Sequence, residues 1–173
     1  APGHTFFLEI LSDGGIVEAC GCGFRLRFER RVRKERGRTV KGGTRMHIDH
    51  ISIYTHDLER LKEFYCKYFS GKVNEKYRNP KTGLETYFIT FESGTTRLEI
   101  RSRPGMKEKD NAFMSAGLAH LAFCAGSREQ VDELTRELVR DGYMLKSGPR
   151  ETGDGYYESC ILDPDSNEVE ITA

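Results

Sequence analysis

The sequence lacks features that several classes of protein require. No apolar run approaches the roughly 20 residues of a transmembrane helix, which argues against a helical membrane protein. The short apolar run at residues 6–11 has no Lys or Arg before it, so it is not typical of a secretory signal peptide. Net charge is also absent, because 27 Lys and Arg residues balance 27 Asp and Glu residues. The overall charge therefore gives no indication of a nucleic acid or a membrane as partner.

A set of cysteines suited to disulfide pairing is missing too. The five cysteines are odd in number and scattered along the chain, which argues against a disulfide framework. Such usage is typical of a reducing compartment, so we expect a cytoplasmic protein. The 173 residues are enough for one sizeable core, or for two small modules that share one.

Residues 1–45 differ in composition from the rest of the chain. They carry ten Lys and Arg against five Asp and Glu, whereas residues 46–173 carry seventeen against twenty-two. Glycines interrupt any regular apolar period in this segment, so we expect a disordered or non-native basic extension. An arm that contacts nucleic acid or an acidic partner is the alternative interpretation.

From residue 46 onward the sequence repeats one arrangement of elements. An alternating strand centred on a histidine is followed by an amphipathic helix that ends at a glycine, and then by three further strands. The distance from His50 to Gly71 is 21 residues, and that from His120 to Gly142 is 22 residues. A repeat that keeps its register this closely indicates a duplicated structural unit.

The repeat predicts an α+β fold made of two βαβββ modules in tandem. Residues 46–102 form the first module, residues 103–116 a linker, and residues 117–173 the second module. The strands are expected near residues 47–54, 72–78, 86–92 and 96–102, and again near residues 117–124, 143–147, 156–162 and 168–172.

Two histidines and two glutamates occupy equivalent positions in the two modules. Glu99 follows His50 by 49 residues, and Glu170 follows His120 by 50 residues. Strand alternation places each of the four opposite a pair of large apolar residues, so the four can line one concave trough. Two carboxylates shielded from water need a cation or protons beside them. We therefore predict one divalent metal ion as cofactor, bound by all four side chains.

The donor set narrows the choice of metal without fixing it. Two neutral imidazoles and two carboxylates form a neutral shell around a divalent ion and leave one or two positions open. Mixed nitrogen and oxygen donors without thiolate suit Ni²⁺, Zn²⁺, Co²⁺, Mn²⁺ or Fe²⁺, with nickel or zinc favoured. A structural zinc site would be closed and rich in cysteine, which this set is not.

Residues 46–173 resemble the vicinal oxygen chelate superfamily, which includes glyoxalases, bleomycin-resistance proteins and extradiol dioxygenases. The resemblance rests on the segments IDHISIYTHDLERLKEFYCKYFSGKV, TRLEIRS, GLAHLAF and LDPDSNEVEIT. It implies that the modules build an open, curved β-barrel-like sheet around one metal site. Within the superfamily, the set of His50, Glu99, His120 and Glu170 is similar to that of glyoxalase I, the lactoylglutathione lyase.

The resemblance also implies a reaction and partners. It predicts a lyase or isomerase that moves a proton, through a metal-stabilised enediolate, on a small α-oxo thiol adduct of glutathione or another thiol. Glu170 is the expected catalytic base, and Glu99 is the second candidate. The expected assembly is a homodimer. The alternatives are an epimerase, a dioxygenase or thiol transferase of the same superfamily, or a non-catalytic protein that binds a small molecule.

Several cationic side chains are candidates for binding an anionic substrate. These are Arg78, Arg97, Arg101, Lys146 and Arg150. The segment SGPRETGDGYY at residues 147–157 contains three glycines and a proline, which predicts a mobile flap with Tyr156 or Tyr157 as a further substrate contact.

Overall fold

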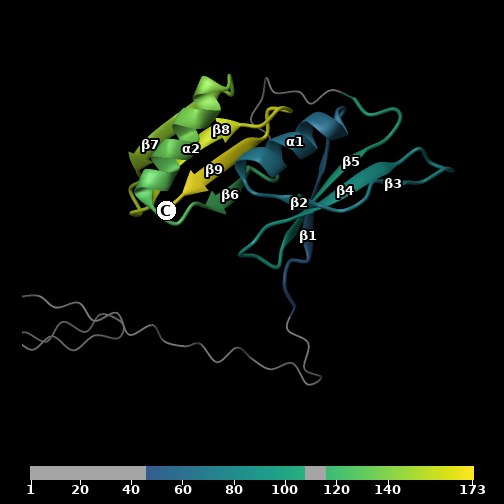
Figure 1. Ribbon diagram of the computed structural model, residues 1–173, viewed down its shortest axis with the longest axis horizontal. Helices are drawn as coiled ribbons and strands as arrows, with labels where there is room; N and C mark the ends of the chain where they lie inside the picture. Colours follow the sequence, from purple (N-terminus) through teal and green to yellow (C-terminus); the bar gives the residue numbers. More distant parts are fainter. Residues whose placement is uncertain (1–45, 108–115) are drawn as a thin grey trace, which may run out of the picture. The chain divides into compact units, whose positions relative to one another are not determined.

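Two similar modules follow one another in the computed structural model, which describes residues 46–107 and 116–173 (Figure 1). The second is βαβββ, whereas in the first two short strands that pair with the same neighbour stand where the repeat predicts one. The expected extension at residues 1–45 and residues 108–115 of the expected linker lie outside this described part. The first module contains β1 (His50–Tyr54), α1 (Leu58–Tyr68), β2 (Lys72–Val73), β3 (Tyr77–Arg78), β4 (Glu85–Thr90) and β5 (Arg97–Ser102). The second contains β6 (His120–Cys124), α2 (Arg128–Arg140), β7 (Leu145–Glu151), β8 (Tyr157–Leu162) and β9 (Glu168–Thr172).

Each module has its own sheet, and the first strand of the module lies at the edge of that sheet. The strand order is β1-β5-β4-β2 in the first sheet, where β3 also pairs with β4, and β6-β9-β8-β7 in the second. The pairs β1–β5 and β6–β9 are parallel, while all other pairs in the described residues are antiparallel. The predicted α+β fold is confirmed, with two sheets that are not closed into a barrel.

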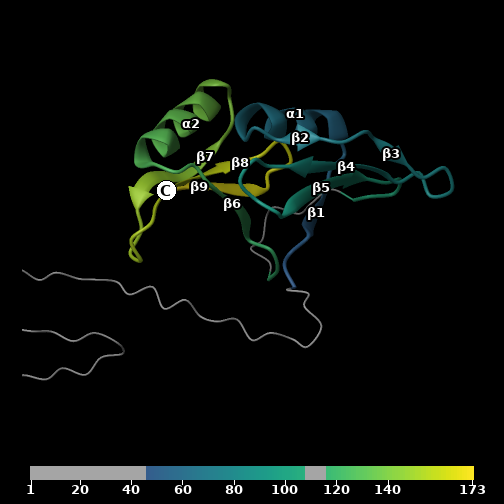
Figure 2. The ribbon, with the colours of Figure 1, turned by 60° about the horizontal axis from the view of Figure 1, so that its bottom comes forward.

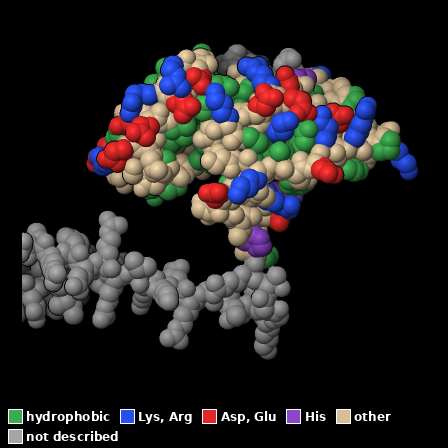
Figure 3. Space-filling view, viewed as in Figure 1, with side chains coloured by type: hydrophobic (Ala, Val, Ile, Leu, Met, Phe, Trp, Pro, Cys, Tyr) green, Lys and Arg blue, Asp and Glu red, His purple; other side chains and the backbone are tan. Residues whose placement is uncertain are grey.

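The two helices cover the same side of the sheets (Figure 2). Each begins at a residue whose side chain accepts a hydrogen bond from a backbone N–H of the first turn: Asp57 accepts from Arg60, and Ser127 from Gln130. The apolar residues of β5 and β9 are buried on the helix side, and so Glu99 and Glu170 lie on the opposite face. On the surface seen in Figure 3, acidic and basic side chains are interspersed rather than gathered by sign. None of the helices in the described ranges is long and apolar enough to cross a membrane.

One hydrophobic core joins the two modules. The ring of Phe64 in α1 lies 4.8 Å from that of Tyr143, and the ring of Phe69 lies 4.4 Å from that of Phe123 in β6. Phe91 contacts Phe123 as well, at 4.9 Å between ring centroids. Since aromatic contacts at these distances stabilise beyond the area they bury, the modules form one packed unit and not two independent domains.

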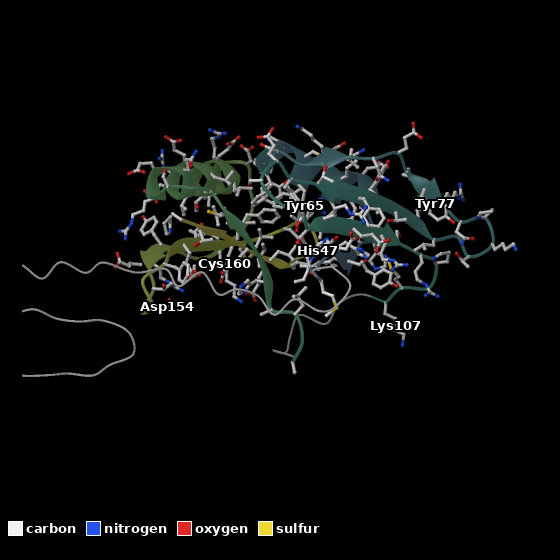
Figure 4. All side chains as sticks on the ribbon, turned by 90° about the horizontal axis from the view of Figure 1, so that it is seen from below. His47, Tyr65, Tyr77, Lys107, Asp154 and Cys160 are labelled. Carbon is white, nitrogen blue, oxygen red and sulfur yellow. The ribbon has the colours of Figure 1, made fainter. Side chains whose placement is uncertain are left out.

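A buried hydrogen-bond cluster also connects the modules. The hydroxyl of Tyr65 in α1 donates to Asp163 Oδ2 at 3.0 Å, and the same carboxylate accepts bonds from the backbone of Asp165 and Asn167. Burial and the neighbouring Asp163 raise the pKa of Tyr65, so this hydroxyl keeps its proton. Through its bonds to the backbone, the carboxylate of Asp163 fixes the turn that leads into β9. Figure 4 shows Tyr65 near the middle of the described domain, with Asp154 and Tyr77 toward opposite ends.

The region expected to be a mobile flap is mostly strand. β7 continues to Glu151 and pairs with β8, and register shifts between Leu145 and Arg150 accommodate the irregular segment. Only residues 152–156 form a loop, and Thr152 closes it by donating its N–H to the carbonyl of Tyr156. The prediction of a flap is wrong for residues 147–151, because the strand accommodates Gly148 and Pro149 where its register with β8 shifts.

Replacing Tyr65 with Phe tests the buried cluster. Loss of the hydroxyl leaves a buried carboxylate oxygen with one donor fewer, so we expect the free energy of unfolding to fall by about 1–3 kcal/mol. Urea denaturation measures this change. Tyr77→Phe is the matched control, because Tyr77 is exposed and its substitution should change stability by less than about 0.5 kcal/mol. Equal effects of the two substitutions would contradict a stabilising role for the Tyr65–Asp163 bond.

Candidate metal site

The first module brings His50 and Glu99 together. Parallel pairing places Ser52 of β1 opposite Glu99 of β5, so that His50 Nε2 lies 4.0 Å from Glu99 Oε2. Glu99 is buried, and its carboxylate accepts a hydrogen bond from Thr86 Oγ1 at 3.2 Å. Arg101 Nη1 lies 3.6 Å from Glu99 Oε2. These contacts hold the carboxylate from two sides, while His50 stays partly exposed. We refer to His50 and Glu99 as the first pair.

The second module brings His120 and Glu170 together in the same way. Ala122 of β6 lies opposite Glu170 of β9, and His120 Nε2 lies 3.2 Å from Glu170 Oε2. On the far side of Glu170, Cys160 of β8 occupies the neighbouring position in the sheet. Burial and, next, the charge of Glu168 raise the pKa of Cys160 to about 11, so the thiol is protonated near neutral pH. His120 and Glu170 form the second pair.

The two pairs do not meet within one chain. Among residues 46–107 and 116–173, no three His, Cys, Asp or Glu side chains lie close enough together to hold a metal ion. The donor separation inside each pair nevertheless suits one ion. With metal–ligand bonds of about 2.0–2.2 Å, neighbouring ligands on one ion lie roughly 2.8–3.6 Å apart. The second pair, at 3.2 Å, has this separation, and the first pair, at 4.0 Å, would reach it by a small movement of its side chains.

Arg97 and Arg101 lie beside the first pair. Arg97 contacts Asp49, and its guanidinium lies 4.6 Å from the ring of Phe88. Arg101 adjoins Glu99, and its guanidinium lies 5.3 Å from the ring of Tyr54. The Nε of Arg101 is buried and has no hydrogen-bond partner among the described residues. An unused donor on a cation next to the pair is a feature of this face that an anion could satisfy.

The other candidate substrate contacts lie elsewhere. Arg78 is 3.4 Å from Glu85 on the adjacent strand, and Arg150 is 3.4 Å from Glu158. Tyr157 lies on the face covered by α2, where its hydroxyl donates to Asp132 at 2.8 Å. The structure does not bring these three side chains to either His–Glu pair.

Sequence reasoning missed two side chains at the first pair, Thr86 and Asp49. Thr86 contacts Glu99 because β4 and β5 are antiparallel neighbours, a pairing that spacing alone does not register. Asp49 Oδ2 lies 2.9 Å from His50 Nδ1. Asp49 directly precedes His50 in the chain, and this adjacency could have marked it as a partner of that histidine.

A cleft of about 560 Å³ opens at the junction of the modules, away from both pairs. Its lining comes from the end of β1, the start of the linker and the turn between β8 and β9: Ile53, Tyr54, Thr55, His56, Met106, Lys107, Pro164, Asp165, Ser166 and Asn167. Burial raises the pKa of Asp165 there. None of the four candidate ligands lines this cleft, so its size alone does not mark it as the site of the chemistry.

Comparisons with known proteins agree with this architecture. A sequence model of the Glyoxalase/Bleomycin resistance protein/Dioxygenase superfamily matches residues 47–171. The uncharacterized protein YqjT of Bacillus subtilis is 28% identical over 133 residues, which cover 73% of this chain and 98% of YqjT. YwkD of the same organism, also uncharacterized, is 27% identical over 124 residues, 72% of this chain and 94% of YwkD.

Solved structures show the same fold at low identity. A glyoxalase family protein from Enterococcus faecalis is 22% identical, with a TM-score of 0.61 over 73% of this chain and 97% of its own. The trypanothione-dependent glyoxalase I of Leishmania major is also 22% identical, with a TM-score of 0.59 over 73% of this chain and 86% of its own. The chain thus belongs to the glyoxalase, bleomycin-resistance and dioxygenase superfamily, the vicinal oxygen chelate proteins.

Proposed function

We propose that the protein is a metal-dependent, glyoxalase-like lyase or isomerase that transfers a proton on a small α-oxo thiol adduct. The observation that carries the proposal is the pair of equivalent His–Glu half-shells, each on a parallel strand pair with a partly exposed imidazole. The fold family contains proteins named glyoxalase I, which supports the reaction class.

The complete site would combine the first pair of one protomer with the second pair of another. Support comes from the described residues, in which no three candidate donors gather within one chain and β1 and β6 each lie at the edge of their sheet. Exposed apolar residues stand two positions before each histidine, Ile48 and Leu118, and would be covered by a second copy. A two-fold dimer built this way has two identical sites, each with four ligands.

The metal would be divalent, with nickel or zinc favoured among the ions that accept mixed nitrogen and oxygen donors. When bound, such an ion polarises neighbouring substrate oxygens and stabilises the charge that develops on them. The imidazoles of His50 and His120 would hold it through Nε2, the nitrogen that faces the glutamate in each pair.

Glu170 is the better candidate for the base that moves the proton. Glu99 is held by Thr86 and Arg101 and is almost fully buried, so its carboxylate is fixed. The side chain of Glu170 is 21% exposed, and its nearest ionic partner is His120. A base must reach the substrate proton, and the less restrained carboxylate is better suited to that movement.

The substrate would be anionic, because the partly exposed guanidinium groups of Arg97 and Arg101 lie beside the first pair. The thiol carrier could be glutathione or another thiol, and the scattered free cysteines Cys66, Cys124 and Cys160 are compatible with a thiol-rich cytoplasm.

A turnover assay on the metal-loaded protein with methylglyoxal and a panel of thiols tests the proposed reaction class. The thiols include trypanothione, because one glyoxalase I of this fold is described as trypanothione-dependent. Acyl-CoA substrates of epimerases are assayed separately. We expect turnover with a thiol adduct; turnover of the acyl-CoA substrates alone would show that the protein is an epimerase and not a lyase.

Mixed dimers test the shared site. His50→Ala and His120→Ala each damage both sites of a homodimer, and we expect neither variant to have activity. When both are co-expressed with different tags and purified through both tags, each mixed dimer keeps one intact site. We therefore expect about half of the wild-type activity. Tag-selected dimers without activity would locate all four ligands in a single chain, and absence of any dimer would refute the shared site.

Glutamine substitutions separate the two glutamates. We expect Glu170→Gln to lower kcat by roughly 10²–10⁴-fold, as loss of a general base does, while bound metal is retained at high metal concentration. Glu99→Gln should weaken metal binding and leave much of kcat when the metal is saturating. Glu92→Gln, on an exposed turn, is the control. A Glu170→Gln protein that keeps its metal and turns over normally removes Glu170 from the role of base.

A further inference from the structure

The carboxylate of Asp49 connects two side chains at the first pair. His50 Nδ1 lies 2.9 Å from Asp49 Oδ2, and Arg97 Nη2 contacts the same oxygen. We infer that Asp49, held by Arg97, is a positioning residue that fixes His50 in the Nδ1–H tautomer and leaves Nε2 free to bind the metal. This inference rests on the metal site proposed above.

The tautomer follows from the hydrogen-bonding capacity of the groups. A carboxylate beside a guanidinium is ionised and can only accept, so the proton of this bond must be on His50 Nδ1. A neutral imidazole carries one N–H, and hence Nε2 keeps its lone pair. Nε2 is also the nitrogen that faces Glu99, at 4.0 Å from Oε2. The bond to Asp49 thus selects the nitrogen that the first pair needs as a ligand.

Neighbouring groups hold this arrangement in place. The backbone N–H of Arg97 donates to the carbonyl of Asp49 at 2.9 Å, which aligns the start of β1 with β5. The ring of Phe88 meets the imidazole of His50 edge-on, at 5.4 Å and an interplanar angle of 87°. The guanidinium of Arg97 lies over the ring of Phe88. Aspartate on one side and phenylalanine on the other restrict rotation of the imidazole.

The second module has no equivalent of this group. Ala119 precedes His120 where Asp49 precedes His50, and Glu168 stands at the register position that Arg97 occupies in the first module. Glu168 contacts Lys146 of β7. The contacts of Asp49 therefore preorganise the first pair, and no carboxylate directly precedes His120 in the second. Loss of such an outer carboxylate typically weakens metal binding by about 10–100-fold.

Nitrogen-15 NMR of the metal-free, full-length chain reads the tautomer directly. At about pH 8.5, where ordinary imidazoles are neutral, we expect wild-type His50 to carry its proton on Nδ1. Asp49→Ala should shift it toward Nε2–H, and Asp49→Asn should retain Nδ1–H, because the amide oxygen still accepts. The His120 signals should be unchanged in both variants. An Asp49→Ala protein in which His50 stays Nδ1–H overturns the inference.

Metal affinity gives the second measurement. Competition dialysis with Ni²⁺ or Zn²⁺ should give a dissociation constant about 10–100-fold higher for Asp49→Ala than for wild type, with most of the loss recovered in Asp49→Asn. Asp154→Ala, on the exposed loop between β7 and β8, is the matched control and should bind as wild type does. Equal affinity of Asp49→Ala and wild type contradicts the inference. A wild-type protein that binds neither metal refutes the proposed function instead. The NMR measurement of the His50 tautomer then tests the role of Asp49 by itself.

Discussion

The hydrogen bond from Tyr65 to Asp163 links the two halves of the molecule within their shared hydrophobic core. It crosses from α1 of the first module to the turn before β9 of the second, and the same carboxylate orders that turn. Glu170 lies in β9, directly after this turn, so the bond also helps to position the glutamate of the second pair. Phe123 of β6 takes part in the packing around this bond. The side chains of His50 and His120, on the edge strands β1 and β6, remain exposed.

Parallel pairing of the first and last strands of each module creates the pairs themselves. A histidine in β1 and a glutamate in β5 are 49 residues apart in sequence, yet the register places Ser52 opposite Glu99, two positions from His50. The same register recurs at Ala122 and Glu170. Period-two alternation was enough to predict from the sequence which residues share a face. Internal repetition then predicted that both modules would be built alike, because each element recurs at the same spacing.

Other parts of the site could not be predicted from one sequence, for physical reasons. Thr86 reaches Glu99 only because β4 lies beside β5, and sheet order is a tertiary property that alternation does not encode. β7 runs through Gly148 and Pro149 because β-bulges absorb them, against their usual tendency to end a strand. Whether four ligands meet in one chain depends on which surfaces of the modules pack together. Spacing is identical for either arrangement.

The two halves of the proposed site differ in a way that suits different tasks. In the first pair, Thr86 and Arg101 restrain Glu99, and Asp49 restrains His50, so both donors are held before any ligand arrives. In the second pair, His120 and Glu170 contact each other directly, with fewer restraints from their neighbours. A rigid pair minimises the ordering cost of binding an ion, because its side chains lose little freedom. A less restrained carboxylate can leave its resting position and carry a proton. The two modules carry the same candidate ligands, and in the proposed site the surrounding side chains would make one pair an anchor and the other the mobile partner.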